Sequence, residues 1–258
     1  MRCNAERFVE ALIATEVMAM QQREAEKKAL LEQKAKTYVV TVSRDFGSMG
    51  KKVAQLLADT LEIRCCDRYI LQEVSRRANV DEKIVSVLDE HVKNTDTHWW
   101  QQLLHKDTFT YEDYYQNLVK TIISISHIGG VIVGRGANFI LGASQAFRIR
   151  ITGSEQQCAG RVARREQIRT AESIERVRQV NSERAEYIRM LYGHDINDPS
   201  AYDLVLNSDR YDREQIVELI LDAMEKAGYK LPDDVRESLR VLAHPDESNE
   251  NTQGHPFH

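Results

Sequence analysis

Short runs of β-branched and aromatic residues alternate with longer amphipathic stretches from Thr37 onwards. The runs are TYVVTV (37–42), IRCC (63–66), GVIVG (130–134), FRIRI (147–151) and YDLVL (202–206). Such runs are typical of strands, and continuous rather than alternating hydrophobicity favours strands that are covered on both faces. The pattern predicts an α/β fold with a parallel sheet of about five strands and helices on both of its faces.

Amphipathic stretches with a helical period connect these strands. The first carries Val53, Leu56, Leu57 and Leu61, and the last carries Ile216, Val217, Leu219, Ile220 and Met224. The segment 81–128 contains two more helical patterns, DEKIVSVLDEHV and YEDYYQNLVKTIISISH. Because this segment is too long for a simple connection, we expect a helical insertion between the second and third strands, of the kind that can close over a substrate.

The two ends of the chain differ from the α/β domain, which we place at residues 37–228. Residues 5–36 contain neither Gly nor Pro, and their apolar residues recur at helical spacing, which predicts an N-terminal helical extension at 1–36. This helix is expected to pack on the main domain or on a second subunit in a homodimer. Residues 229–258 are polar, end in HPDESNENTQGHPFH and are predicted to be a disordered tail.

The composition is that of a globular domain rather than of a nucleic-acid or membrane protein. Of the 258 residues, 42% are hydrophobic and 29% are charged, and the formal net charge is -5. A generic nucleic-acid binder usually has a basic face, and no apolar stretch approaches the roughly 20 residues that span a bilayer. The four cysteines form no C-x-x-C pattern, and Cys65 and Cys66 are interpreted as buried strand residues. We therefore expect a soluble cytoplasmic protein without nucleic-acid or membrane partners.

The stretch TVSRDFGSMGKKVA (41–54) connects the first strand to the first helix. The helix should begin at Gly50 or Lys51, so that its free amides and its dipole face the edge of the sheet. The letters depart from the Walker A phosphate loop, G-x-x-x-x-G-K-[ST], because no glycine stands five residues before Gly50 and Lys52 takes the hydroxyl position. Arg44, Lys51 and Lys52 nevertheless predict an anion site; the alternative is an ordinary turn with exposed lysines.

Two further stretches carry arginines that could meet a phosphate. Gly134-Arg135-Gly136 follows the third strand, at the edge where parallel sheets bind ligands. Arg161, Arg164 and Arg165 share one face of a predicted helix, and such clusters neutralise charge in phosphoryl-transfer enzymes. The alternatives are a tight turn with a solvated arginine and a solvated basic face.

Neither a metal site nor a base-stacking site is the favoured interpretation of the histidines and aromatic residues of the insertion. His91, His98 and His105 repeat every seven residues, which places neighbours about 10.5 Å apart along a helix, too far to share one ion. The HWW run (98–100) and Tyr111, Tyr114 and Tyr115 could stack on a base, but packing inside the insertion is favoured.

The three basic stretches occur in this order together with CCDRYILQEV after the second strand and NSERAEYIRMLYGHDINDPSAYDLVLNS before the last helix. In this combination, residues 37–225 resemble the cytidylate-kinase-like family of P-loop nucleoside monophosphate kinases. The loop of that family typically reads I-S-R-E-(Y/F)-G-S-G-G-R, and this chain has V-S-R-D-F-G-S-M-G-K. The resemblance implies a P-loop NTPase fold with a lid at about 154–190.

The resemblance also implies roles for the matching residues. The phosphate-loop and ATP-binding set is Arg44, Gly47, Ser48, Gly50, Lys51 and Lys52. The acceptor nucleotide would be bound by Asp67, Arg135 and Arg184, and the catalytic set is Lys51, Arg161, Arg164 and Arg165. The P-loop lysine of true cytidylate kinases falls at Gly50, and its loss should cost about 10²–10³ in rate unless another cation reaches in.

The implied activity is transfer of the γ-phosphoryl group of ATP, with Mg²⁺, to a pyrimidine nucleoside monophosphate such as CMP or dCMP. No protein ligand is assigned to the Mg²⁺ ion. The altered lysine position motivates a second hypothesis, a catalytically weak nucleotide or phospho-ligand sensor on the same fold. A third hypothesis is a structural dimer built on the N-terminal helix.

Overall fold

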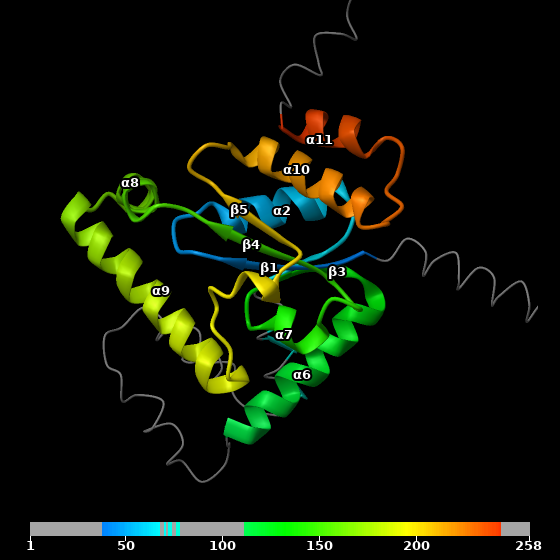
Figure 1. Ribbon diagram of the computed structural model, residues 1–258, viewed down its shortest axis with the longest axis horizontal. Helices are drawn as coiled ribbons and strands as arrows, with labels where there is room; N and C mark the ends of the chain where they lie inside the picture. The colour runs from blue at the N-terminus through cyan, green and yellow to red at the C-terminus, as the bar shows by residue number, and fades with distance from the viewer. Residues whose placement is uncertain (1–37, 68–69, 71, 74–75, 78–110, 244–258) are drawn as a thin grey trace, which may run out of the picture. The chain divides into compact units, whose positions relative to one another are not determined.

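The computed structural model describes residues 38–243, except for 68–69, 71, 74–75 and 78–110 (Figure 1). The predicted N-terminal helix, the first part of the predicted insertion and its three histidines, and residues 244–258 lie outside the described residues.

Five parallel strands form one sheet in the order β2-β3-β1-β4-β5. The strands are β1 (Val39–Arg44), β2 (Cys65–Cys66), β3 (Gly130–Val133), β4 (Phe147–Thr152) and β5 (Leu204–Asn207). Val40 of the central strand is in register with Val131 on one side and Phe147 on the other. Each strand falls within or beside a predicted run, so the predicted sheet of about five parallel strands is confirmed.

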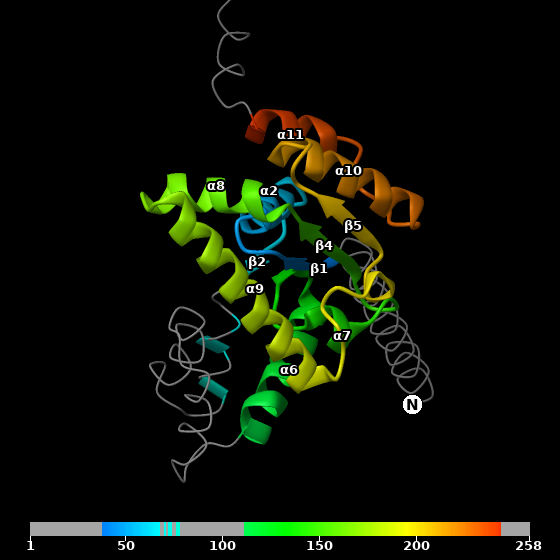
Figure 2. The same ribbon diagram turned by 60° about the vertical axis from the view of Figure 1, so that its left-hand side comes forward.

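Helices cover both faces of this sheet, as predicted. They are α2 (Gly50–Thr60), α6 (Tyr111–Ile128), α7 (Ala137–Leu141), α8 (Glu155–Glu166), α9 (Thr170–Tyr192), α10 (Arg213–Lys226) and α11 (Val235–Ala243), with a short 3₁₀ turn at Pro199–Ala201. Figures 1 and 2 show α2, α10 and α11 on one face, α6 and α7 on the other, and α8 and α9 beyond the carboxyl ends of the strands. The short helix α7 was not predicted.

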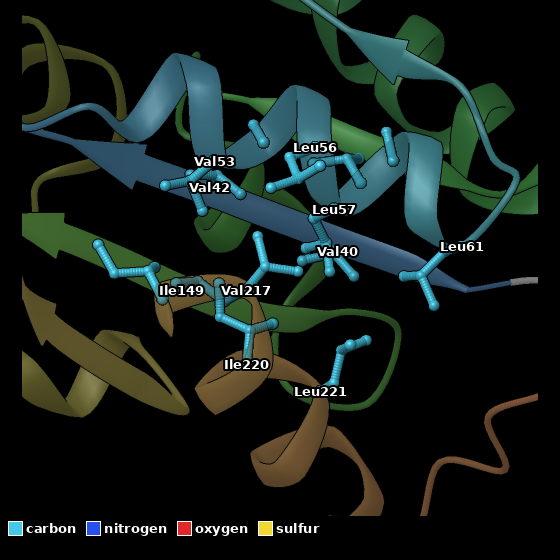
Figure 3. Close-up of a cluster of buried hydrophobic side chains, with 14 of the residues drawn as sticks. Val40, Val42, Val53, Leu56, Leu57, Leu61, Ile149, Val217, Ile220 and Leu221 are labelled. Carbon is cyan, nitrogen blue, oxygen red and sulfur yellow. The ribbon is translucent and has the colours of Figure 1, made fainter. Parts of the chain in front are cut away.

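Apolar side chains pack on both faces of the strands, which explains the continuous hydrophobic runs. Val40 and Val42 point into the larger cluster, where α2 and α10 contribute side chains such as Leu57 and Ile220 (Figure 3). Val39 belongs to the cluster on the opposite face, under α6 and α7. Because β1 and β3 pair in parallel, their carboxyl ends lie side by side at the same edge of the sheet.

Helix α11 shows that the prediction of a disordered tail from residue 229 was wrong for residues 229–243. Val235 and Leu239, four residues apart, are buried in the larger cluster. Leu231 packs against that cluster, and the hydroxyl of Tyr38 donates to the carbonyl of Lys230 over 2.6 Å. The segment is polar on average, but one helical face is apolar, and that face is sufficient for docking.

The described cysteines are free thiols, and Cys65 and Cys66 constitute β2 as predicted. Burial raises the pKa of Cys65 to about 11, which keeps this thiol protonated and unreactive. None of the helices within the described ranges has the length and hydrophobicity that crossing a membrane would need.

Candidate functional site

The turn between β1 and α2 is held in shape by its own polar atoms. The buried hydroxyl of Ser48 donates to the carbonyl of Asp45 over 2.9 Å and lies 3.1 Å from the carbonyl of Ile151. Gly47 has a φ of +86°, and a Cβ there would lie 2.6 Å from the carbonyl oxygen of Cys158, so only glycine fits. The Ser48 side chain thus fixes the shape of the turn through two backbone carbonyls.

Helix α2 begins at Gly50, as predicted, and its first amides face the carboxyl edge of the sheet. Its N-cap residue, Met49, has a left-handed φ of 64° and makes no side-chain hydrogen bond to the helix. Because no side chain caps them, the amides of this first turn can donate hydrogen bonds to an anion, and the helix dipole favours negative charge there. Met49 stands where the loop of the resembling family has a glycine. The backbone at Met49 nevertheless has the left-handed conformation that glycine usually provides.

The first loop cation, Lys51, is engaged by an acid. Its Nζ lies 2.8 Å from Oδ2 of Asp67, the residue that follows β2. Burial alone would raise the pKa of Asp67, but the hydrogen bond from Lys51 and the charges of Arg44 and Arg135 outweigh it and hold that pKa below its ordinary value. Lys52 is exposed on α2. The predicted phosphate-loop lysine and the predicted acceptor aspartate are therefore direct partners.

Three arginines from three separate segments line one small cavity at the carboxyl edge. Arg44, Arg135 and Arg184 enclose about 40 Å³ together with Asn138 and Tyr187. Nη1 of Arg184 donates to the carbonyl of Arg44 over 3.0 Å. Burial, followed by the charges of Arg44 and Arg135, lowers the pKa of Arg184 to about 9. This concentration of positive charge is unfavourable by itself and would be relieved by a bound oxyanion.

A strained turn presents Arg135 to this cavity. Gly134, Arg135 and Gly136 all have left-handed φ values, of 76°, 59° and 67°. The hydroxyl of Tyr192 donates to the carbonyl of Arg135 over 2.6 Å, and a Cβ at Gly136 would lie 2.1 Å from the ring of Tyr192. Left-handed geometry at a non-glycine residue costs about 1–2 kcal/mol. Such strain is found at ligand sites, and here it aims Arg135 at the cavity.

Helices α8 and α9 occupy the region predicted as a lid, but the three arginines of α8 have different partners. Arg161 donates to the carbonyls of Gly47 and Ser208, over 3.3 and 2.6 Å, and so connects α8 to the turn between β1 and α2. Arg164 is exposed and donates to the carbonyl of Gly160 in its own helix. Arg165 pairs with Glu166 and lies over the ring of Phe46, 5.2 Å from its centre. The structure therefore does not gather these three arginines around one point.

Comparison with known proteins gives this arrangement a context. The sequence model described as "Cytidylate kinase-like family" matches residues 39–210, which is more than half of the chain. The chain belongs to the cytidylate kinase-like family. A cytidylate kinase from Sulfurisphaera tokodaii is 24% identical over 183 residues, which are 70% of this chain and 92% of that protein. An uncharacterised protein from Eubacterium ventriosum has a similar fold, with a TM-score of 0.56 and 20% identity over 73% of this chain and 99% of that chain.

Two side chains of this family member's site were missed from sequence. Arg150 of β4 is buried and donates to Ser43 over 3.0 Å and to Asp45 over 2.8 Å, so it stiffens the start of the loop. An arginine inside the apolar FRIRI run could have indicated this role, because a buried charge needs a partner. Asn138 is also buried, lines the cavity, and its Nδ2 has no hydrogen-bond partner within the described part of the chain. No pattern in the sequence marked Asn138 as a site residue, because it lies on helix α7, which was not predicted.

Tyr114 and Tyr115 of α6 pack rather than forming a stacking surface, but their partners lie on α9 and not inside the predicted insertion. Tyr114 of α6 is buried, and its hydroxyl lies 3.1 Å from that of Tyr187 on α9. The ring of Tyr115 lies 6.0 Å from that of Tyr192. These contacts connect α6 to the helix that carries Arg184 rather than forming an open stacking surface.

The donor set of the described site suits a polyanion better than a metal ion. Arginine, lysine, amide and backbone N–H groups all donate hydrogen bonds, as phosphate oxygens require. Of the carboxylates beside these cations, Asp67 is paired with Lys51 and Asp45 with Arg150, and the described ranges contain no group of three or more His, Cys, Asp or Glu side chains that could hold a metal ion. No protein ligand is assigned to Mg²⁺.

Proposed function

We propose that this protein transfers the γ-phosphoryl group of ATP to the α-phosphate of a pyrimidine nucleoside monophosphate of the CMP or dCMP type. The observation that carries the proposal is the convergence of Arg44, Arg135 and Arg184 on one cavity, beside the uncapped start of α2. Membership of the cytidylate kinase-like family supports the same reaction class.

The site divides into a donor side and an acceptor side. Residues 47–52 would bind the ATP phosphates through backbone amides and cations, while Asp67, Arg135 and Arg184 would hold the acceptor. The acceptor phosphate is already ionised at neutral pH, so the reaction needs positioning and charge neutralisation rather than a strong base. Magnesium, arriving with the triphosphate, would neutralise phosphate charge. We expect this chemistry in the reducing cytoplasm, where the free thiols persist.

A catalytically weak nucleotide or phospho-ligand sensor is the second candidate. It is favoured by one observation: Gly50 stands at the position of the P-loop lysine, and the neighbouring Lys51 is held by Asp67. In a sensor the same cations would bind a polyanion without transferring a phosphoryl group.

Measurement of ADP formation across a panel of ribo- and deoxyribonucleoside monophosphates tests the proposal. We expect turnover that depends on the acceptor and is highest with CMP or dCMP. Saturable ATP binding without acceptor-dependent turnover would favour the sensor. An absence of any nucleotide-dependent shift in melting temperature would contradict both and favour a structural role.

A further inference from the structure

We propose that Arg44 supplies the cation that other phosphate loops take from a lysine, and that it has exchanged places with Gly50. The inference rests on the proposed function for its catalytic part, but its anion-binding part stands alone. In the spacing G-x-x-x-x-G-K, the lysine follows the first glycine by six residues. Arg44 and Gly50 are six residues apart, with the cationic residue first and the glycine second, the reverse of the standard order.

The stem of Arg44 occupies the space that a side chain at position 50 would need. A Cβ at Gly50 would lie 2.4 Å from Cβ of Arg44 and 3.0 Å from its Cγ. Side chains do not tolerate such separations, and the obstructing atoms belong to the rigid base of Arg44 rather than to its flexible end. Glycine at position 50 is therefore the condition that lets Arg44 cross the start of α2.

The other end of Arg44 reaches the acceptor side of the site. A Cβ at Gly134 would lie 2.1 Å from Nη1 of Arg44, so the guanidinium lies against the turn that follows β3. From there its charge acts on Asp67, whose pKa it lowers, and on Arg184, whose pKa it also lowers. Arg44 thus spans from the donor loop to the acceptor cavity, where the transferred group must pass.

The two lysines of the loop are placed less well for this role. Lys51 is paired with Asp67, and its side chain is 68% exposed. Lys52 is exposed on α2 and does not line the cavity. Of the three loop cations, only Arg44 lines the cavity together with Arg135 and Arg184.

In the transfer step, an acceptor phosphate oxygen attacks the γ-phosphorus of ATP. The bond between that phosphorus and the β,γ-bridging oxygen breaks, and its electron pair stays on the β-phosphate of ADP. Charge develops on the bridging oxygen and on the oxygens of the transferred group. A guanidinium between donor and acceptor can donate to both, with a planar geometry that suits phosphate.

The test compares the wild type with Arg44→Gly, Gly50→Lys and the exchange variant Arg44→Gly/Gly50→Lys. Calorimetry measures the binding of inorganic tripolyphosphate, and an ADP assay measures turnover with CMP. Arg44→Gly should weaken tripolyphosphate binding by about 10- to 100-fold, as expected for a lost charge-assisted hydrogen bond. The exchange variant should recover most of that loss, because it restores the standard spacing of glycine and lysine. Arg64 precedes β2 at the amino end of that strand, and Arg64→Met, which removes one charge there, should leave binding unchanged.

Several results would overturn the inference. They are wild-type affinity in Arg44→Gly, an exchange variant that folds but binds no better than Arg44→Gly, and a wild type that binds no tripolyphosphate. If the exchange variant does not fold, Arg44→Lys should bind tighter than Arg44→Met, and equal affinities would contradict the role of the charge. A wild type that binds tripolyphosphate but shows no CMP-dependent turnover would refute the proposed kinase activity, while the binding comparison still tests Arg44.

Discussion

Lys51 and Asp67 form an ion pair of 2.8 Å between Nζ and Oδ2, which connects the first turn of α2 to the residue after β2. The two side chains are 68% and 27% exposed, so solvent screens the pair and its contribution to folding is small, about 0–1 kcal/mol. Its position at the carboxyl edge, next to Arg44 and Arg135, indicates a role in binding rather than in stability.

Lys51→Ala, which removes the partner of Asp67 on the acceptor side, should therefore lower acceptor-dependent ADP formation and leave the melting temperature nearly unchanged. A steady-state assay and a thermal melt of the same preparation check this expectation. Full activity in the double variant Lys51→Ala/Arg135→Ala would refute the assignment of both residues.

The low pKa of Asp67 makes a prediction about acid stability. A carboxyl with a depressed folded-state pKa contributes stability above its ordinary value of 3.8, and this contribution is lost as the pH falls through the lower folded-state value. The difference in unfolding free energy between the wild type and Asp67→Asn should thus be constant from neutral pH to about pH 5, and shrink below about pH 4. Denaturant melts at several pH values measure it. A difference that grows on acidification would show that the ion pair does not govern the titration.

Arg135→Ala should reduce turnover by about 10²-fold or more with almost no loss of stability. Alanine meets the same left-handed backbone cost as arginine, and removing the charge relieves repulsion with Arg184. The Arg64→Ala variant, at the amino end of β2, should retain activity and serves as the control. A large drop in melting temperature for Arg135→Ala alone would instead assign this arginine to the structure.

Arg161→Ala should destabilise the fold by about 1–3 kcal/mol, because this guanidinium satisfies the carbonyls of Gly47 and Ser208. Arg164→Ala is the matched control on the same helix and should cost less than about 0.5 kcal/mol, since its side chain is exposed. Urea titration of the two variants distinguishes two roles for Arg161: a structural connection between α8 and the β1–α2 turn, or a lid residue that contributes little to stability. Equal stabilities with reduced turnover in Arg161→Ala would support the lid role.

Leu239→Ala should cost about 2–5 kcal/mol, because Leu239 is buried in the larger core cluster. Leu242, on the same helix, is 42% exposed, and its replacement by alanine should cost far less. Equal, small effects in urea titrations would mean that α11 is not docked in solution.

The strands and the position of the turn between β1 and α2 could be predicted because their signals are local. Continuous apolar runs at 37–42 and 147–151 indicate strands buried on both faces, whatever packs on them. The start of α2 at Gly50 follows from the end of an apolar strand and the onset of helical periodicity. Helix α11 was not predicted because residues 229–258 are polar on average. The spacing of Val235 and Leu239, which share one helical face, was the signal that could have revealed it.

By itself, the sequence determined the sheet and the helix that follows β1. Only the tertiary structure decided which cation does what: Arg161 binds the loop 114 residues away, Lys51 is held by Asp67, and Arg44 crosses Gly50 to the cavity. The physical reason is that strand formation depends on neighbours in the chain, whereas the partner of a guanidinium or an ammonium group depends on which segments the sheet order and the tight glycine turns bring within about 3 Å.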